Sequence, residues 1–478
     1  MNTQVTRMIQ SLATAGVVSV LLAAVPAQAV TLDELAGKLA ALEAQNAALK
    51  AKVEQLEALQ QRQSGQVAQQ ATQMQQQAEQ VQQQALQSQK QAETLEKVQQ
   101  TASSGSAGSA AWAASTTVSS YGEIGYSRPT KASEQANADV ARAVIGMTHR
   151  FDEQTKMVGE WEWEHAVTSS SDAGESEVEQ LYVEHEFKNG LRGKAGLFLM
   201  PVGLINQNHE PTAYYGVFRP DVDTKIVPST WREVGVGLSG DTSLGLSWDA
   251  GLTTAPNLSK WDASTDEGRV RGPLAAIHGE GQVAAARDLG LHAALNWRGL
   301  PGLLLGGSVY TSKIGQQQPG FLGNDARLLL LDVHTRYELG AWDFAGEYVR
   351  GTISNTEALN TSYATSGVAN PTLVPALFYG GYVQAAYRYR LDESLMLSPF
   401  VRYEVLNTAA GYGALPATSG GVAQPNEKIW TVGTSFRIGE GVVLKADYRK
   451  YQNDKLPSSL PNAWNKGDSL NLGMGYAF

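Results

Sequence analysis

Residues 118–478 alternate between apolar and polar side chains, and this period of two constrains the fold more than any other feature of the chain. On an extended strand, side chains two positions apart share one face. In the segment that starts at Arg327, one face carries Leu329, Leu331, Val333 and Tyr337, and the other carries Asp332, His334, Arg336 and Glu338. Such segments are predicted to be β-strands with one apolar and one polar face.

We count sixteen such segments, most of them about ten residues long. Their number is even, as a closed single-chain membrane barrel requires. They span residues 118–127, 139–150, 156–167, 177–187, 191–200, 233–240, 244–254, 286–297, 302–312, 327–338, 342–352, 379–390, 395–406, 429–437, 442–451 and 468–478.

The connections between these segments alternate between short and long. The short ones cover 152–154, 188–190, 240–242, 298–301, 339–341, 392–394 and 439–441, and the longer ones include 201–232, 254–285, 353–378, 407–428 and 452–467. A barrel with short periplasmic turns and long extracellular loops has this pattern, whereas a soluble β-sandwich, the alternative, does not sort its loops by length. We therefore predict an all-β transmembrane barrel of 16 antiparallel strands over 118–478, with both of its ends at the periplasmic side.

Composition excludes several other classes of protein. The chain has no cysteine, which excludes disulfides and Cys-based metal sites. Beyond residue 30 it has no apolar run of about 18 residues, so no helical span is expected in the mature chain. The formal net charge of −10 argues against non-specific nucleic-acid binding.

The N-terminal region has a different pattern from the barrel. Residues 1–29 resemble a cleaved secretory signal that ends in Ala27-Gln28-Ala29, although a membrane anchor is the alternative. Residues 30–100 are predicted to form an α-helical coiled-coil stem in the periplasm, because an a/d seam begins with Leu32, Leu35, Leu39 and Leu42 and includes Asn46. A single amphipathic helix docked elsewhere is the alternative, and 101–117 is predicted to be a flexible linker.

A barrel of sixteen strands encloses a lumen too wide for wall side chains to fill. The connection at 201–232 is long and rich in aromatic residues, so it is interpreted as an ordered constriction loop. The alternative is an external loop that packs on its neighbours.

Charged residues on the polar faces are the candidates for lining this lumen. The loop contributes Arg219, Lys225 and Arg232; one arc of the wall contributes Arg388, Arg402, Arg437, Lys445 and Arg449; and another contributes Glu160, Glu162 and Glu164. Opposed basic and acidic walls would favour polar or charged solutes over apolar ones. Alternatively, these charges solvate a wet wall or pair across neighbouring strands.

Catalytic motifs are absent from the sequence. It contains no H-E-x-x-H pair and no G-x-S-x-G elbow. Asp221-Val222-Asp223 is interpreted as a solvated turn rather than a cation site. We therefore expect no enzyme activity, cofactor or metal; a membrane-embedded lipase and a surface adhesin with a coiled-coil stalk are the rival functions.

The segment Gly196-Leu197-Phe198-Leu199-Met200-Pro201-Val202-Gly203 carries a resemblance to a known family. Gly196, Phe198, Pro201 and Gly203 match the G-x-F-x-x-P-x-G entry to the third loop of the phosphate-selective porin O and P family of bacterial outer-membrane proteins. The resemblance implies a trimer of sixteen-stranded barrels with the third loop inside, and selection of phosphate or other anions in some members. The charges of the third loop in this chain are nearly balanced, which departs from that anion chemistry.

The predicted function is a porin of the outer membrane that passes small hydrophilic solutes, with a bias toward anions. Its expected partners are outer-membrane lipid, two further copies of the chain in a homotrimer, and small polar or charged solutes. The terminal Phe478 resembles the signal read by the outer-membrane assembly machinery, and the stem could also reach the cell wall.

Overall fold

The computed structural model describes residue 37 and residues 112–169, 171–415, 424–453 and 467–478. The predicted signal peptide, almost all of the predicted stem and most of the predicted linker lie outside the described residues. Within the described part, every helix is too short or too polar to cross a membrane.

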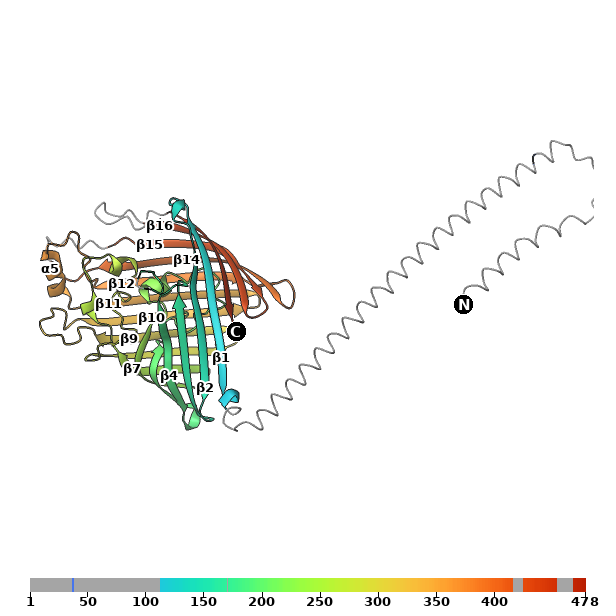
Figure 1. Ribbon diagram of the computed structural model, residues 1–478, viewed down its shortest axis with the longest axis horizontal. Helices are drawn as coiled ribbons and strands as arrows, with labels where there is room; N and C mark the ends of the chain where they lie inside the picture. Colours follow the sequence, from blue (N-terminus) through green and yellow to red (C-terminus); the bar gives the residue numbers. More distant parts are fainter. Residues whose placement is uncertain (1–36, 38–111, 170, 416–423, 454–466) are drawn as a thin grey trace, which may run out of the picture. The chain divides into compact units, whose positions relative to one another are not determined.

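The described chain is dominated by seventeen strand segments that form one sheet (Figure 1). They are β1 (Thr116–Pro129), β2 (Asn137–Arg150), β3 (Thr155–Glu164), β4 (Ser176–Glu186), β5 (Arg192–Leu199), β6 (Arg232–Asp241), β7 (Leu246–Thr254), β8 (Leu289–Leu300), β9 (Leu303–Lys313), β10 (Arg327–Leu339), β11 (Trp342–Ser354), β12 (Leu377–Tyr387), β13 (Tyr389–Arg390), β14 (Leu395–Gly411), β15 (Glu427–Ile438), β16 (Val442–Asn453) and β17 (Ser469–Ala477).

The sheet is closed, because β1 pairs antiparallel with β2 on one side and with β17 on the other. The closing register runs from Tyr121 opposite Ala477 to Pro129 opposite Ser469. Segments β12 and β13 are separated only by Arg388 and both pair with β14, so together they are one strand of the barrel. The barrel therefore has sixteen antiparallel strands, which confirms the predicted fold class for this part of the chain.

The connections alternate in length as predicted. Short turns join β2 to β3, β4 to β5, β6 to β7, β8 to β9, β10 to β11, β13 to β14 and β15 to β16. The longer connections at the opposite rim carry most of the short helices, which are η1 (Ser133–Gln135), η3 (Val222–Ile226), η4 (Leu258–Lys260), α4 (Glu267–Val270) and α5 (Glu357–Thr365); η2 (Lys188–Gly190) lies in a short turn.

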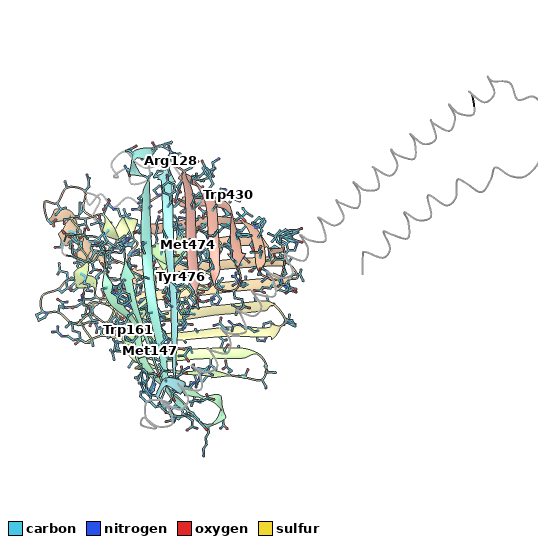
Figure 2. The ribbon with its side chains drawn as sticks, turned by 45° about the vertical axis from the view of Figure 1, so that its right-hand side comes forward. Arg128, Met147, Trp161, Trp430, Met474 and Tyr476 are labelled. Carbon is cyan, nitrogen blue, oxygen red and sulfur yellow. The ribbon has the colours of Figure 1, made fainter. Side chains whose placement is uncertain are left out.

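Side chains alternate between the two faces of the wall. On β10, Val333 is 61% exposed while its neighbour Asp332 is 3% exposed. The closing strands behave in the same way, with Met474 on β17 exposed and Asn471 buried. Figure 2 labels Met474 and, on β15, the exposed Trp430 in the closing part of the wall. The barrel thus has an apolar exterior and a polar interior.

Several strand ends differ from the predicted bounds by one to five residues; strand β8, for example, spans Leu289–Leu300 instead of 286–297. Strand β3 ends at Glu164 rather than at residue 167, because His165 and Ala166 adopt positive φ angles of 56° and 59° that do not continue a strand. Strand β14 extends to Gly411 instead of ending at residue 406.

An apolar core lies where the long connections pack against one another and against the strands. Its fully or almost fully buried members include Trp231, Leu258, Ile277, Ile314, Leu328, Ile353 and Phe378. Burial of each such side chain stabilises the packed state by roughly 1.5–3 kcal/mol. This core holds the β5–β6 connection at the rim where it turns into the barrel.

Candidate functional site: the lumen and its inward loop

The β5–β6 connection, residues 200–231, is closed at its neck by one amide side chain. The N–H of Met200 donates to the carbonyl of Trp231 at 2.9 Å. The Nδ2 of Asn206 donates to the carbonyls of Met200 and Trp231 at 2.8 and 2.9 Å, and its Oδ1 accepts the Trp231 N–H at 2.7 Å. Both ends of the loop are therefore fixed together before its central part enters the barrel. We call residues 201–231 the inward loop.

Two glycines of the segment 196–203 are required by the backbone. Gly196 has φ = +137°, and a Cβ there would collide with the carbonyl oxygen of Leu181. Gly203 has φ = +71°, and a Cβ there would collide with the carboxylate of Glu347. Glycine is the residue that tolerates both the positive φ and the close approach, so these positions shape the entry to the inward loop.

One side of the inward loop is attached to β14 and β16. The backbone N–H of Val217 donates to Oδ2 of Asp447 at 2.6 Å, and that of Asp221 donates to Oε2 of Glu404 at 2.7 Å. The side chain of Asp221 also pairs with Nη2 of Arg449 at 2.8 Å. Carboxylates of the wall thus accept backbone N–H groups that would otherwise be buried without a partner.

Basic side chains of the same wall bind loop carbonyls. The fully buried Arg402 pairs with Glu404 at 2.8 Å and directs Nη2 toward the carbonyls of Phe218 and Arg219. Arg437 on β15 donates to the carbonyl of Thr212 at 2.8 Å. The ammonium of Lys445 lies 3.6 Å from the centre of the Tyr214 ring, a cation–π contact.

The other side of the inward loop is attached to β1, β2, β10 and β11. Tyr214 donates to Glu123 on β1 at 2.5 Å, and Arg142 on β2 donates to the carbonyl of His209 at 2.6 Å. Tyr215 donates to Asp343 on β11 at 2.7 Å.

The entry of the loop is held in the same way. The N–H of Gly203 donates to Asp332 at 3.1 Å, and the N–H of Leu204 donates to Glu347 at 3.0 Å. Since the wall residues belong to strands from around the ring, the inward loop lies inside the barrel and crosses the lumen.

The segment Asp221-Val222-Asp223 is not the solvated turn that the sequence predicted. It lies at the start of the π-helical turn η3, and Asp221 and Asp223 are both buried. Lys225 binds Asp221 and, on β15, Glu427, each at 3.0 Å. The polar residues of this segment suggested that it is exposed to solvent. In the structure, basic residues that include some on strands distant in the sequence neutralise its carboxylates.

The two aspartates respond to burial in opposite directions. Burial opposes ionisation of Asp221, but Arg449 and Lys225 hold its pKa well below the ordinary value. Burial raises the pKa of Asp223 to about 7, and the nearby Glu404 carboxylate adds to that effect. Asp223 is therefore the titratable group of the inward loop near neutral pH.

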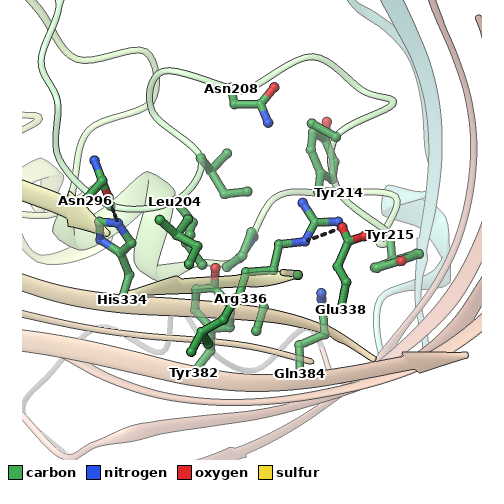
Figure 3. A pocket seen from close by; sticks show the side chains of 18 of the residues that line it. Leu204, Asn208, Tyr214, Tyr215, Asn296, His334, Arg336, Glu338, Tyr382 and Gln384 are labelled. Atoms are coloured by element: carbon green, nitrogen blue, oxygen red, sulfur yellow. Dashed lines mark hydrogen bonds and ion pairs between the residues drawn. The ribbon is translucent and has the colours of Figure 1, made fainter. Parts of the chain in front are cut away.

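A cavity of about 480 Å³ lies between the inward loop and strands β8 to β12 (Figure 3). His334, Arg336 and Glu338 of β10 face it from the wall, and Asn208 and Tyr214 face it from the loop. Its charged lining residues are Arg298, Arg336, Arg402 and Glu338, with His334 beside them. Apolar side chains such as Leu204, Leu300 and Leu304 share the lining with these polar groups. The charged groups are more often basic than acidic, and they make the cavity suitable for water and small hydrophilic solutes.

The structure gives each candidate lining residue a place. Arg402, Arg437, Lys445 and Arg449 bind the inward loop, which itself carries Arg219 and Lys225. Arg232 at the start of β6 pairs with Glu177 at 2.6 Å, and Arg388 near a short turn pairs with Glu338 at 2.9 Å. Glu160, Glu162 and Glu164 lie on β3, and Glu162 is buried. Whether any of them contacts a permeating solute stays a prediction.

Sequence reasoning missed several residues that hold or face the inward loop. They are Glu123, Arg142, Arg298 and Glu404. All but Arg298 alternate with apolar neighbours on their strands, and that signal would have identified them as inward-facing. Their partners in the loop could not be predicted from spacing.

Comparison with solved structures finds the same barrel fold in proteins that are porins. A structure of Salmonella typhi OmpF in complex with daunomycin superposes with a TM-score of 0.53 and 16% identity, covering 76% of this chain and 97% of that chain. The outer-membrane channel DcaP of Acinetobacter baumannii is also similar, with a TM-score of 0.47, 11% identity and coverage of 76% of this chain and 97% of that one. At this level of identity the likeness concerns the fold. The described chain shares with OmpF the fold of a closed barrel of sixteen antiparallel strands.

Sequence comparison identifies a relative. An uncharacterized protein of Aquifex aeolicus is 30% identical over 356 residues, which cover 72% of this chain and 78% of that protein. The chain belongs to the same family as that protein. No protein-family model matches the sequence.

Proposed function

We propose that this protein is an outer-membrane porin that lets small hydrophilic solutes diffuse through the lumen beside the inward loop. Exposed apolar side chains on the wall suit contact with lipid hydrocarbon, and the polar interior suits water. The rim with the short turns then faces the periplasm, as in outer-membrane barrels generally.

The attachment of the inward loop to the wall carries this proposal. The loop is bonded to strands as far apart in the ring as β2 and β11 and narrows the barrel, yet a cavity of about 480 Å³ remains beside it. A loop held in this way leaves a path of limited width, which is how a barrel admits small solutes and excludes large ones. The constriction would therefore be at the level of the inward loop.

A preference for anions is supported by the charges of this cavity. Arg298 and Arg336 line it together with the single carboxylate of Glu338, whereas Arg402 borders it but is fully buried and paired with Glu404. Arg336 also pairs with Asp343 at 2.6 Å, so part of its charge is compensated. We propose a modest anion preference, with phosphate among the candidate solutes.

Planar-bilayer recordings test the pore and its selectivity together. We expect stepwise conductance from the folded full-length protein and a reversal potential that favours anions under a salt gradient. Arg336→Gln should lower the anion-to-cation permeability ratio, because it removes a positive charge from the cavity and the cationic partner of Asp343. Arg350→Gln is the matched control, since it removes a charge from an exposed residue of β11.

A folded protein without conductance would reject the pore. A strong cation preference of the unchanged protein would reject the anion bias alone.

The same proposal includes two further points. One is the resemblance to the phosphate-selective porin O and P family, and the other is assembly as a homotrimer. The G-x-F-x-x-P-x-G segment supports the first, and the heptad seam that starts at Leu32 supports the second. Deletion of residues 30–100 separates the roles of stem and barrel: we expect the melting temperature of the trimer to fall. An unchanged trimer would mean that the stem does not hold the protomers together.

A further inference from the structure

A histidine of the inward loop and two glutamates of the wall converge outside the cavity described above. The potential ligand atoms of Glu160 on β3, Glu179 on β4 and His209 in the loop all lie within 4.8 Å of one another. Glu179 and His209 are buried, and Glu160 is half-buried. The three residues are distant in sequence and meet only in the folded barrel.

A β-bulge directs Glu179 toward the lumen. In the β3–β4 register, Glu160 pairs with Gln180 while Trp161 pairs with Val178, so Glu179 has no partner residue on β3. The extra residue in a bulge changes the direction of its side chain and is typical of functional positions. Glu179 is consequently 0% exposed, and its side chain faces that of His209.

The histidine ring is oriented by its other nitrogen. Nδ1 of His209 lies 2.9 Å from the carbonyl oxygen of Asn206 and must donate to it, since a carbonyl only accepts. In the neutral ring Nε2 then carries a lone pair, and it lies 2.8 Å from Oε1 of Glu179 and within 4.8 Å of the Glu160 carboxylate. A backbone carbonyl on Nδ1 with Nε2 free to coordinate is a common arrangement of metal-bound histidine.

The cluster has more acceptors than donors. Nε2 of His209 lies 2.8 Å from Oε1 of Glu179 and 2.7 Å from the hydroxyl of Tyr121, and that hydroxyl lies 2.9 Å from Oε2 of Glu179. If the ring is neutral, the hydroxyl proton of Tyr121 is the one proton available to these three contacts. Among the described residues, no donor is aligned for a hydrogen bond to the buried Oε1 of Glu179, although His209 lies within ion-pair distance. A buried, negatively charged oxygen without a donor calls for a cation.

We propose that Glu160, Glu179 and His209 bind a divalent transition-metal ion of the zinc type, which joins the inward loop to strands β3 and β4. One imidazole nitrogen and two carboxylate oxygens are ligands that such ions take at about 2.0–2.2 Å, with the Tyr121 hydroxyl or water completing the shell. Arg142 donates a hydrogen bond to the backbone carbonyl of His209 and not to its ring, so the ligand atoms remain accessible to the ion. The ion would fix the loop to β3 and β4, a part of the wall separate from β14 and β16, where Arg402 and Arg449 hold it.

Zinc titration of the full-length protein, folded in detergent and competed with a chromophoric chelator, tests this site. We expect one tightly bound Zn²⁺ per chain, and at least about a 10-fold weaker affinity in His209→Gln and in Glu179→Gln. His292→Gln is the matched control, because His292 also pairs with a carboxylate, that of Asp249 at 2.9 Å, but lies outside the three-residue cluster. Heat-dependent migration on gels verifies that each variant is folded.

Should His209→Gln fail to fold, Glu160→Gln serves instead, since its amide keeps the shape of the side chain. Absence of tight zinc binding by the folded protein overturns the proposal and leaves a shared proton as the cation. Unchanged binding by His209→Gln or Glu160→Gln overturns it as well. Conductance is measured separately, so loss of the metal site would not be mistaken for loss of the pore.

Discussion

Individual charged residues inside this barrel act mainly in pairs. Arg402 and Glu404, both fully buried, and Arg449 with Asp221 balance one another where the inward loop meets β14 and β16. Sequence patterning identified the basic members of these pairs but not the pairing itself. Arg402 pairs within its own strand and Arg449 pairs with the inward loop, so neither pair joins neighbouring strands.

Removing Arg402 should loosen this attachment. Arg402→Met breaks a fully buried ion pair and leaves Glu404 only the more distant Arg449, at 3.5 Å, so we expect the free energy of unfolding to fall by roughly 3–5 kcal/mol. Arg388→Met breaks the more exposed pair with Glu338 and should cost only about 0–1 kcal/mol. Urea unfolding in lipid vesicles, followed by tryptophan fluorescence, measures both. Equal effects of the two variants would contradict the assigned role of Arg402.

Asp223 should make the attachment of the loop depend on pH. Its pKa is raised by burial to about 7, above the ordinary value of about 3.9, so the folded protein holds this proton more tightly than the unfolded chain. The stabilisation is complete below the ordinary pKa and is lost as pH rises through about 7. We expect the free energy of unfolding to decrease between pH 4 and 7, and current fluctuations of the open channel to increase above pH 7.

Asp223→Asn has no titratable proton at this position. It should therefore weaken the pH dependence of both the free energy of unfolding and the current fluctuations. The groups around Asp223 are Glu404, Arg219, Arg402, Asp332 and Glu347. A variant that keeps the full pH dependence of the unchanged protein would show that one of these groups is responsible.

The strands follow the sequence pattern closely, because each has one face toward lipid and one toward water. On β10 the buried and exposed residues alternate from Arg327 to His334. A period of two is visible in any one strand without knowledge of its neighbours. The inward loop has no such periodicity, and its course depends on contacts with at least six strands.

Two substitutions at different depths along β10 test whether the outer face of the wall contacts lipid. Leu331→Arg places a charge near the middle of β10 and should destabilise the barrel by about 2–4 kcal/mol. Leu339→Arg places the same charge at the end of the strand, next to a short turn, and should cost about 0–1 kcal/mol. Both side chains are exposed on the wall. Unfolding in vesicles measures the difference, and equal costs would argue against a bilayer around β10.

Closure of the sheet is a property of the whole barrel and not of any single strand. Since β1 pairs with both β2 and β17, every strand has two neighbours and the sheet has no free edge. All of these pairings lie within residues 116–477.

A chain of residues 112–478 should therefore fold alone. We expect it to give a barrel with heat-dependent gel migration and the single-channel conductance of the full-length protein. Failure to fold in detergent or lipid would show that the preceding residues contribute to the barrel itself.

The amino-acid sequence by itself predicted the strands, their number, the two kinds of turn and the glycine-rich entry to the inward loop. Each of these follows from neighbouring residues, through the alternation of side chains along a strand and the backbone freedom of glycine. The burial of Asp221 and Asp223, and the meeting of His209 with Glu160 and Glu179, depended on the closed barrel. Those contacts join segments far apart in the chain, and the curvature and register of the wall determine which of them come within bonding distance.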